Sequence, residues 1–205
     1  MRKIFPLFAV VASLSLVGCA TEPSKYVEFE NTTKFVKNGT IYTKKDMASG
    51  IRWNNDYVVT AKHVTFAKDI EYKSPGELDL QFVKNSGNNV ILPQWRERQA
   101  GESVSIVGVN QSGKTKIVTG KDLDIYSEQG NSINYLTTAV TVGGQSGGPV
   151  FGHDGKVIGM LVAITNGKDA SGNKDQALAN KGEQFSLYIP YSIIEAEWNK
   201  FQKKS

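Results

Sequence analysis

The sequence predicts an all-β protein with a single helix at its C-terminal end. Short runs rich in β-branched and aromatic residues recur along the chain, and turns containing glycine or asparagine separate most of them. Many short strands at close spacing with little helix are typical of a β-sandwich or β-barrel. The last segment differs, because after Pro190 the apolar side chains recur at helical spacing on one face.

Residues 1–18 have the pattern of a signal peptide. Arg2 and Lys3 supply a positive start, and an almost unbroken apolar run follows from Ile4 to Val17. This run is shorter than the roughly 20 residues that a membrane-spanning helix needs. We therefore expect residues 1–18 to direct export.

The end of this segment, Leu16-Val17-Gly18-Cys19, resembles the bacterial lipobox, in which the cysteine is lipidated and becomes the mature N-terminus. Cys19 is the only cysteine, so it can form no disulfide within the chain. The alternative is an ordinary signal peptide with an incidental cysteine. The resemblance implies a lipoprotein of the bacterial envelope, and Ala20 favours the outer membrane, facing the periplasm. Residues 19–33 then form a polar linker, and residues 34–205 form one domain.

The charge balance gives no indication of a nucleic-acid partner. Without Arg2 and Lys3 the chain keeps 22 basic and 20 acidic residues, a net charge of +2, and no basic stripe with interleaved aromatics occurs. No second apolar segment is long enough to span a bilayer. We expect no metal or other cofactor.

The domain begins with a predicted hairpin around Asn38-Gly39, a strong turn signal. Residues 166–182 are polar and predict a long exposed loop, and the helix follows Pro190. The expected strands, in order, are Phe35–Val36, Thr40–Thr43, Ser49–Trp53, Tyr57–Ala61, Ile70–Tyr72, Leu78–Val83, Val104–Val109, Thr115–Val118, Ser132–Thr138, Val150–Phe151, Val157–Ile164 and Gln184–Ile189.

One serine lies in an unusually glycine-rich stretch, Gly143-Gly-Gln-Ser-Gly-Gly-Pro-Val-Phe151. Glycines allow positive φ and close backbone approach. A serine on such a turn can project its hydroxyl while neighbouring N–H groups point the same way, which is what attack on a carbonyl requires. Ser146 is thus a candidate nucleophile. The alternative is a plain glycine-rich turn.

Two other residues complete a possible relay. His63 follows the strand that ends at Ala61, and Asp79 lies in a predicted strand on the face opposite Leu78, Leu80 and Phe82. A carboxylate there needs a partner, and an imidazole N–H is suitable. The second histidine, His153, lies in a predicted hairpin turn, so we expect it to be exposed and not catalytic.

The order His63, Asp79, Ser146 resembles that of chymotrypsin-fold serine proteases, and the pattern is closest to the bacterial trypsin-like peptidases that include the high-temperature-requirement proteases. The matching motifs are Thr60-Ala61-Lys62-His63, Leu78-Asp79-Leu80 and Gly144-Gln145-Ser146-Gly147-Gly148-Pro149-Val150. The order excludes an α/β-hydrolase, in which the acid and the histidine follow the serine.

The resemblance implies two antiparallel β-barrels of the six-stranded type and a serine endopeptidase that needs no cofactor. Ser146 would attack the peptide carbonyl, His63 would act as base and then acid, and Asp79 would orient His63. The backbone N–H groups of Gly144 and Ser146 would form the oxyanion hole. The rival hypothesis is a binding lipoprotein that keeps this fold without catalysis. We expect no PDZ module after the last helix.

Two departures from the family matter. Gln145 stands where animal-type enzymes have an aspartate that pairs with a freed N-terminus, so we expect folding directly into an active or conditionally active form. Asp79 lies only sixteen positions after His63. This short interval leaves open whether the first barrel is trimmed, and whether Asp69 replaces Asp79 in the triad. We favour Asp79 because of its motif.

The resemblance also locates the substrate pocket. Its floor should lie near Val140 and Thr141, with a wall from about Met160 to Ile164 that includes Leu161, Val162 and Ala163. None of these is acidic, so a preference for Lys or Arg is not expected, and an apolar or small residue before the scissile bond is favoured. A glutamyl preference through the Thr141 hydroxyl is a minor alternative, because no histidine occurs in the facing strand.

Overall fold

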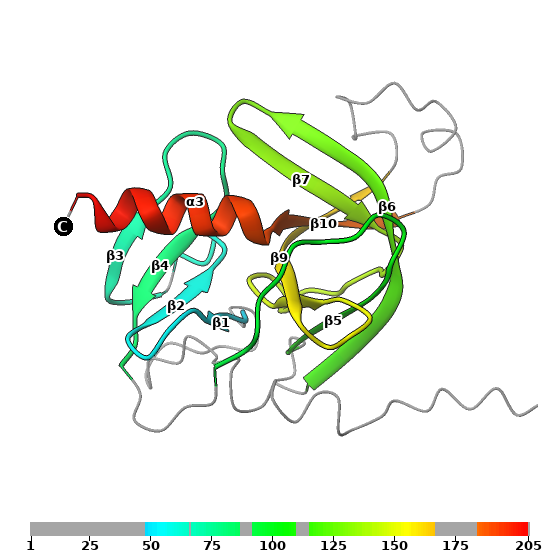
Figure 1. Cartoon of the computed structure of the whole chain (residues 1–205), viewed down its shortest axis with the longest axis horizontal. Helices are drawn as coiled ribbons and strands as arrows, with labels where there is room; N and C mark the ends of the chain where they lie inside the picture. The colour runs from blue at the N-terminus through cyan, green and yellow to red at the C-terminus, as the bar shows by residue number, and fades with distance from the viewer. Residues whose placement is uncertain (1–47, 66, 87–91, 110–114, 167–183, 205) are drawn as a thin grey trace, which may run out of the picture.

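The computed structural model describes residues 48–65, 67–86, 92–109, 115–166 and 184–204. The chain forms an open sheet and a closed barrel, with one helix running across the sheet (Figure 1). The expected hairpin at residues 35–43 and nearly all of the expected loop at 166–182 lie outside the described residues. So do the signal peptide and the linker.

The first sheet has four described strands in the order β1-β2-β4-β3, all antiparallel. Val58, Val59 and Phe82 are fully buried, as expected of strands rich in β-branched and aromatic residues. Its strands are β1 (Ile51–Arg52), β2 (Tyr57–Thr60), β3 (Ile70–Lys73) and β4 (Gln81–Lys84). The described part of the first half is thus a sheet, where the resemblance implied a barrel.

The second half is a closed antiparallel barrel in the order β10-β7-β6-β5-β8-β9. Closure pairs every edge strand, which confirms the expected second barrel. Its strands are β5 (Ser103–Val109), β6 (Thr115–Gln129), β7 (Ser132–Thr137), β8 (Pro149–Phe151), β9 (Val157–Asn166) and β10 (Gln184–Pro190). Strand β6 is far longer than the expected run 115–118 and forms a long hairpin with β7 that projects from the barrel (Figure 1).

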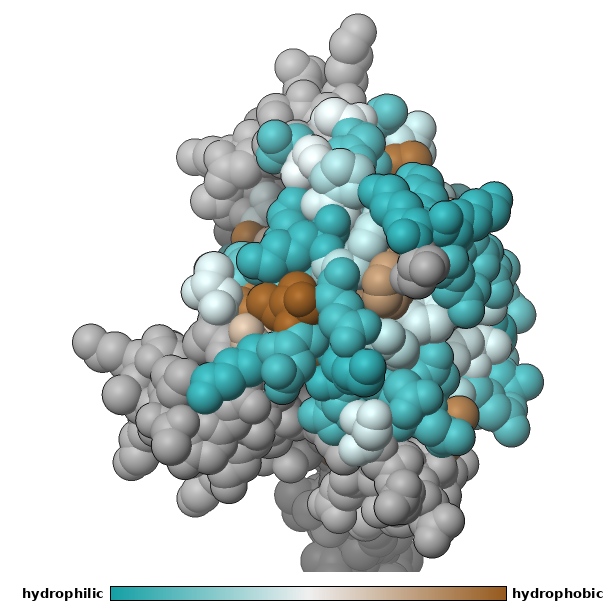
Figure 2. Space-filling model, turned by 90° about the vertical axis from the view of Figure 1, so that its left-hand side faces the viewer, coloured by the Kyte–Doolittle hydropathy of each residue, from teal (hydrophilic) through white to brown (hydrophobic). Residues whose placement is uncertain are grey.

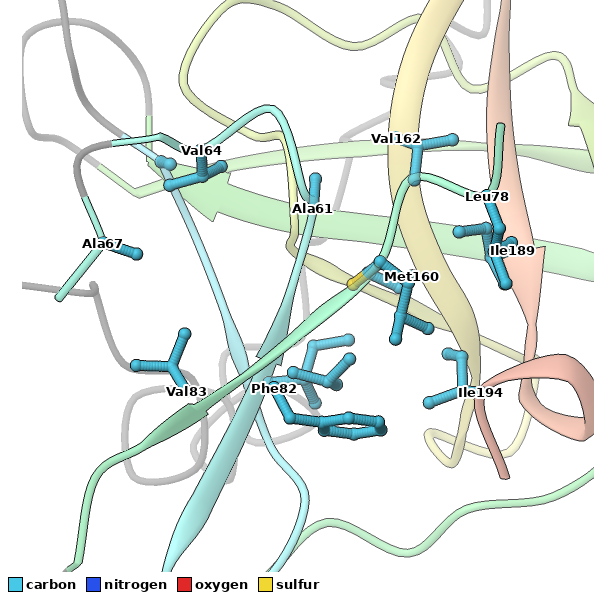
Figure 3. Close-up of a cluster of buried hydrophobic side chains, with 14 of the residues drawn as sticks. Ala61, Val64, Ala67, Leu78, Phe82, Val83, Met160, Val162, Ile189 and Ile194 are labelled. Atoms are coloured by element: carbon cyan, nitrogen blue, oxygen red, sulfur yellow. The ribbon is translucent and has the colours of Figure 1, made fainter. Parts of the chain in front are cut away.

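The sheet and the barrel share one apolar core. Leu78 and Phe82 from the sheet side pack in the same cluster as Met160, Val162 and Ile189 from β9 and β10 (Figure 3). All five side chains are at most 5% exposed. Burial of this size, worth about 1.5–3 kcal/mol per large side chain, fixes how the two halves sit against each other.

Helix α3 (Tyr191–Gln202) starts directly after Pro190, as predicted. It buries Ile194 and Phe201 against the first sheet, and its buried Glu197 accepts a hydrogen bond of 2.6 Å from the Tyr72 hydroxyl. The face at the end of α3 is largely hydrophilic (Figure 2). Of the helices in the described ranges, none is long and apolar enough to cross a membrane.

The segment that joins the two halves is held by one arginine. Arg96 donates to Glu102 at 2.6 Å. It also donates at 2.9 Å to Asp154, which lies in the β8–β9 turn. His153, in the same turn, contacts Glu102 at 2.9 Å. Burial alone would raise the pKa of Glu102, but Arg96 and the other donors lower it to about 2. This ion network ties the connecting segment to the barrel.

Candidate active site

The loop around Ser146 is shaped by two glycines in the left-handed region. Gly144 has φ +96° and Gly147 has φ +80°. A Cβ on Gly147 would lie 2.1 Å from the Ser49 carbonyl oxygen and 2.3 Å from the Thr60 hydroxyl, so no side chain fits there. The Gly147 N–H donates to the Leu161 carbonyl at 2.8 Å. The glycines therefore let the loop lie directly against the end of β2.

Ser49 fastens this loop to the first sheet. Its N–H donates to the Ser146 carbonyl at 2.8 Å, and its hydroxyl donates to the Gly144 carbonyl at 3.3 Å. The Thr60 hydroxyl in turn donates to the Ser49 carbonyl at 2.7 Å. Sequence reasoning missed Ser49, because nothing local signals a contact across 95 residues.

The Gln145 side chain fixes the serine loop through two hydrogen bonds to backbone groups. Its side chain is fully buried, accepts from the Val142 N–H at 2.9 Å, and donates to the Lys116 carbonyl at 3.1 Å. Both ends of the amide are thus satisfied by neutral backbone groups, so this position requires no charged partner.

Two backbone donors at the loop have no acceptor among the described residues. In the part of the chain that the structure describes, the N–H groups of Gly144 and Ser146 donate to nothing, whereas those of the alternating residues Gln145 and Gly147 are bonded. Two free donors flanking a serine are the arrangement that binds an oxyanion.

His63 and Asp79 are paired. The His63 Nδ1 lies 2.6 Å from Asp79 Oδ2, and the His63 backbone N–H donates to Asp79 Oδ1 at 2.9 Å. The hydrogen bond that His63 donates to Asp79 raises the pKa of His63 against the opposing effect of burial. Burial would raise the pKa of Asp79, but its hydrogen bonds with His63 keep it below the ordinary value.

Asp79 is not in a strand, contrary to the prediction. The Leu80 N–H bonds the Leu78 carbonyl at 3.1 Å, which makes a tight turn at Asp79, and β4 begins only at Gln81. The turn aims the carboxylate at His63. Asp69 is exposed at the start of β3, and no contact with His63 is found for it among the described residues.

The three candidate residues come from both halves of the molecule. His63 follows β2 and Asp79 precedes β4, while Ser146 lies in the barrel. A Cβ on Gly147 would lie 3.2 Å from the backbone nitrogen of Ala61, two residues before His63. Within the described residues no hydrogen bond joins Ser146 to His63. Catalytic hydrogen bonds often tighten only when substrate is present.

A pocket of about 140 Å³ opens beside Ser146. Of the predicted lining residues, Thr141, Leu161 and Ala163 line it, and Val140 and Val162 do not. Val162 belongs to the core between the two halves, since alternation along β9 turns it away from Leu161 and Ala163. Ile164, at the end of the predicted wall, also lines the pocket, and the lining residues that sequence reasoning missed are Val142 and Gly143.

The pocket lining has no charged side chain among the described residues. The Thr141 hydroxyl lies 2.9 Å from the Ser186 hydroxyl, and both residues are buried. These hydroxyls satisfy each other. His153, as expected, lies at the surface in the β8–β9 turn, on Glu102 and away from this pocket.

Comparisons with known proteins agree with this fold. Residues 65–160 match the sequence model of the trypsin-like peptidase domain, a range that includes Asp79 and Ser146 and begins two residues after His63. No curated protein matches the chain in sequence.

Several solved structures share the fold. The MamO protease domain of Magnetospirillum magneticum is similar with a TM-score of 0.63 at 18% identity, covering 83% of this chain and 97% of that one. A serine endoprotease from Yersinia pestis gives 0.63 at 16% identity, covering 86% and 66%. The HtrA-type protease AlgW with a decapeptide gives 0.60 at 17% identity, covering 77% and 52%.

This chain thus spans about half to two thirds of the last two proteins and nearly all of the MamO domain. At these identities the likeness establishes the fold. The chain therefore has the chymotrypsin-like fold, and its residues 65–160 are similar to the trypsin-like peptidase domain.

Proposed function

We propose that this protein is a serine endopeptidase that uses His63, Asp79 and Ser146. The observation that supports it most is the His63–Asp79 pair at 2.6 Å, next to a serine loop with two free N–H donors. In the triad mechanism Ser146 Oγ attacks the carbonyl carbon and its proton passes to His63 Nε2. Asp79 holds the tautomer whose Nδ1 carries hydrogen, and Gly144 and Ser146 N–H groups stabilise the oxyanion.

The substrate side of the proposal follows from the pocket. An uncharged lining with Leu161, Ala163 and Ile164 favours an apolar or small side chain before the scissile bond. The HtrA-type protease AlgW has been solved with a decapeptide. By analogy of fold, we propose that an extended polypeptide segment is the substrate here.

The location remains a proposal from the sequence. Lipidation of Cys19 would tether the domain to the bacterial envelope, with the outer membrane facing the periplasm as the preferred site. Metabolic labelling with a palmitate analogue tests this: label should appear on the wild type and disappear in Cys19→Ala. Equal label on both proteins would contradict it.

A fluorophosphonate probe tests the peptidase proposal. The probe reacts with a serine activated by its histidine, so we expect labelling of the wild type and none of Ser146→Ala. Ser49→Ala is a useful comparison, because it removes another serine at the same loop without removing the nucleophile. Absence of Ser146-dependent labelling would favour the rival function, a binding lipoprotein with this fold.

The pH dependence of activity provides a further prediction. The neutral form of His63 is the base, and its pKa lies above the ordinary value of about 6.5 because Asp79 stabilises the imidazolium. The value of kcat/KM should therefore fall as the pH drops through this raised pKa. A pH–rate profile with its acid limb below about pH 6 would contradict this.

A further inference from the structure

The long β6–β7 hairpin reaches from the barrel to the loop of the first half that contains Asp79. We call residues 74–80, between β3 and β4, the Asp79 loop. Figure 1 shows the hairpin tip beside this loop, and hydrogen bonds join them. The Glu77 N–H donates to Asn131 Oδ1 at 3.0 Å, and Asn131 Nδ2 donates to the Pro75 carbonyl at 3.1 Å. One amide side chain thus satisfies a donor and an acceptor of the loop backbone.

The approach is close enough to require glycine on both sides. Gly76 has φ +64°, and a Cβ there would lie 2.6 Å from Asn131 Oδ1. Gly130 has φ +57°, and a Cβ there would lie 3.2 Å from the Glu77 side chain. A side chain at position 76 would overlap the Asn131 amide, and at both positions the left-handed φ favours glycine.

Lys62, the residue before His63, also fixes the Asp79 loop by hydrogen bonds. Lys62 Nζ donates to the Gly76 carbonyl at 2.7 Å and to the Ser74 carbonyl at 3.3 Å. The Ser74 hydroxyl is buried and donates to the Leu80 carbonyl at 2.9 Å. The loop is therefore held near its middle from two sides, by Lys62 of the sheet and by Asn131 of the barrel.

We propose that Asn131 is a positioning residue for the His63–Asp79 pair. It fixes the Asp79 loop at residues 75 and 77, two residues before the carboxylate that must reach His63 within hydrogen-bond distance. Because the hairpin belongs to the same barrel as Ser146, this contact also sets the pair against the nucleophile. Only the expected effect on kcat rests on the proposed peptidase function. The pairing of His63 with Asp79 can be measured in the absence of any catalytic turnover.

Histidine titration by NMR on the purified full chain tests the proposal. The chain has two histidines, so His153 serves as an internal reference. Among the described groups, the charge facing His63 is Asp79, while the ammonium of Lys62 is directed at the loop carbonyls. In Asn131→Ala the Asp79 loop loosens and the pair weakens, so the His63 pKa should fall toward about 6.5.

Asn134→Ala is the matched control. Asn134 is in the same hairpin, and its amide donates to Ser132 within that hairpin. The Asn134→Ala variant should keep the midpoint of the His63 titration at its wild-type value. For peptide hydrolysis we expect Asn131→Ala to lower kcat about tenfold with KM within about twofold, because misalignment affects the chemical step more than binding.

The titration and the activity separate two kinds of failure. A wild-type His63 midpoint in folded Asn131→Ala overturns the positioning role, whatever the peptidase activity. A lowered midpoint in a protein that no fluorophosphonate labels would support the positioning role and reject the peptidase function. Should Asn131→Ala fail to fold, Asn131→Ser keeps a small polar residue at the tip. The same fall in the His63 midpoint is then expected, and its absence would overturn the proposal.

Discussion

Asp79→Asn should lower kcat by about four orders of magnitude while the protein remains folded. The asparagine oxygen can still accept from the His63 backbone N–H, which now bonds Asp79 Oδ1 at 2.9 Å. Its NH₂ group then faces His63 Nδ1, which must accept instead of donate. The ring proton moves to Nε2, and His63 can no longer take the proton of Ser146. Hydrolysis of a peptide library under single-turnover conditions measures the loss.

Asp69→Asn is the control for this experiment, because Asp69 is the other acid near His63 in sequence. It is exposed and lies at the start of β3. We expect its activity to stay within about twofold of the wild type, as is usual for a surface substitution. A larger loss of activity in Asp69→Asn than in Asp79→Asn would show that our proposal assigns the wrong acid to the triad.

Gly147→Ala should destabilise the protein by about 2–6 kcal/mol. Two costs add: a left-handed φ for a residue with a Cβ, about 1–3 kcal/mol, and overlap in a packed site, about 1–3 kcal/mol. The overlap is with the Ser49 carbonyl at 2.1 Å and the Thr60 hydroxyl at 2.3 Å, groups that hydrogen-bond each other. Urea unfolding followed by far-UV circular dichroism gives the change in free energy of unfolding.

Gly101→Ala separates these two costs. Gly101 also has a left-handed φ, +73°, but a Cβ there would meet nothing within 4 Å. It should show the backbone cost alone, about 1–3 kcal/mol. If both variants lost the same stability, the contact between the serine loop and the end of β2 would contribute nothing, contrary to our interpretation.

The sequence predicted those features that local patterns determine. Alternation and turn residues located the barrel strands, and Pro190 followed by helical periodicity located α3. The turn at Asp79 was missed because the apolar residues Leu78 and Leu80 alternate as in a strand. Their burial comes instead from a loop that packs on the shared core.

Long-range contacts account for the remaining differences. The extension of β6 contains polar residues such as Asp122, which is buried in an ion pair with Arg98 at 2.5 Å and also accepts a hydrogen bond from the Tyr188 hydroxyl. No local pattern reveals that partner. Alternation along β9 does separate Leu161 and Ala163 from Val162, so the error at Val162 could have been avoided. The contact between Asn131 and the Asp79 loop spans more than 50 residues and was visible only in the fold.

The aromatic packing under α3 has a spectroscopic consequence. All three tryptophans of the chain meet there: the ring of Trp53 lies 5.1 Å from that of Trp95 and 6.0 Å from that of Trp198. Trp53 follows β1, Trp95 is in the connecting segment, and Trp198 is in the helix. At such separations the three indoles exchange excitation and emit as one unit. Intrinsic fluorescence will therefore report the docking of the C-terminal helix and will be nearly blind to rearrangements of the serine loop.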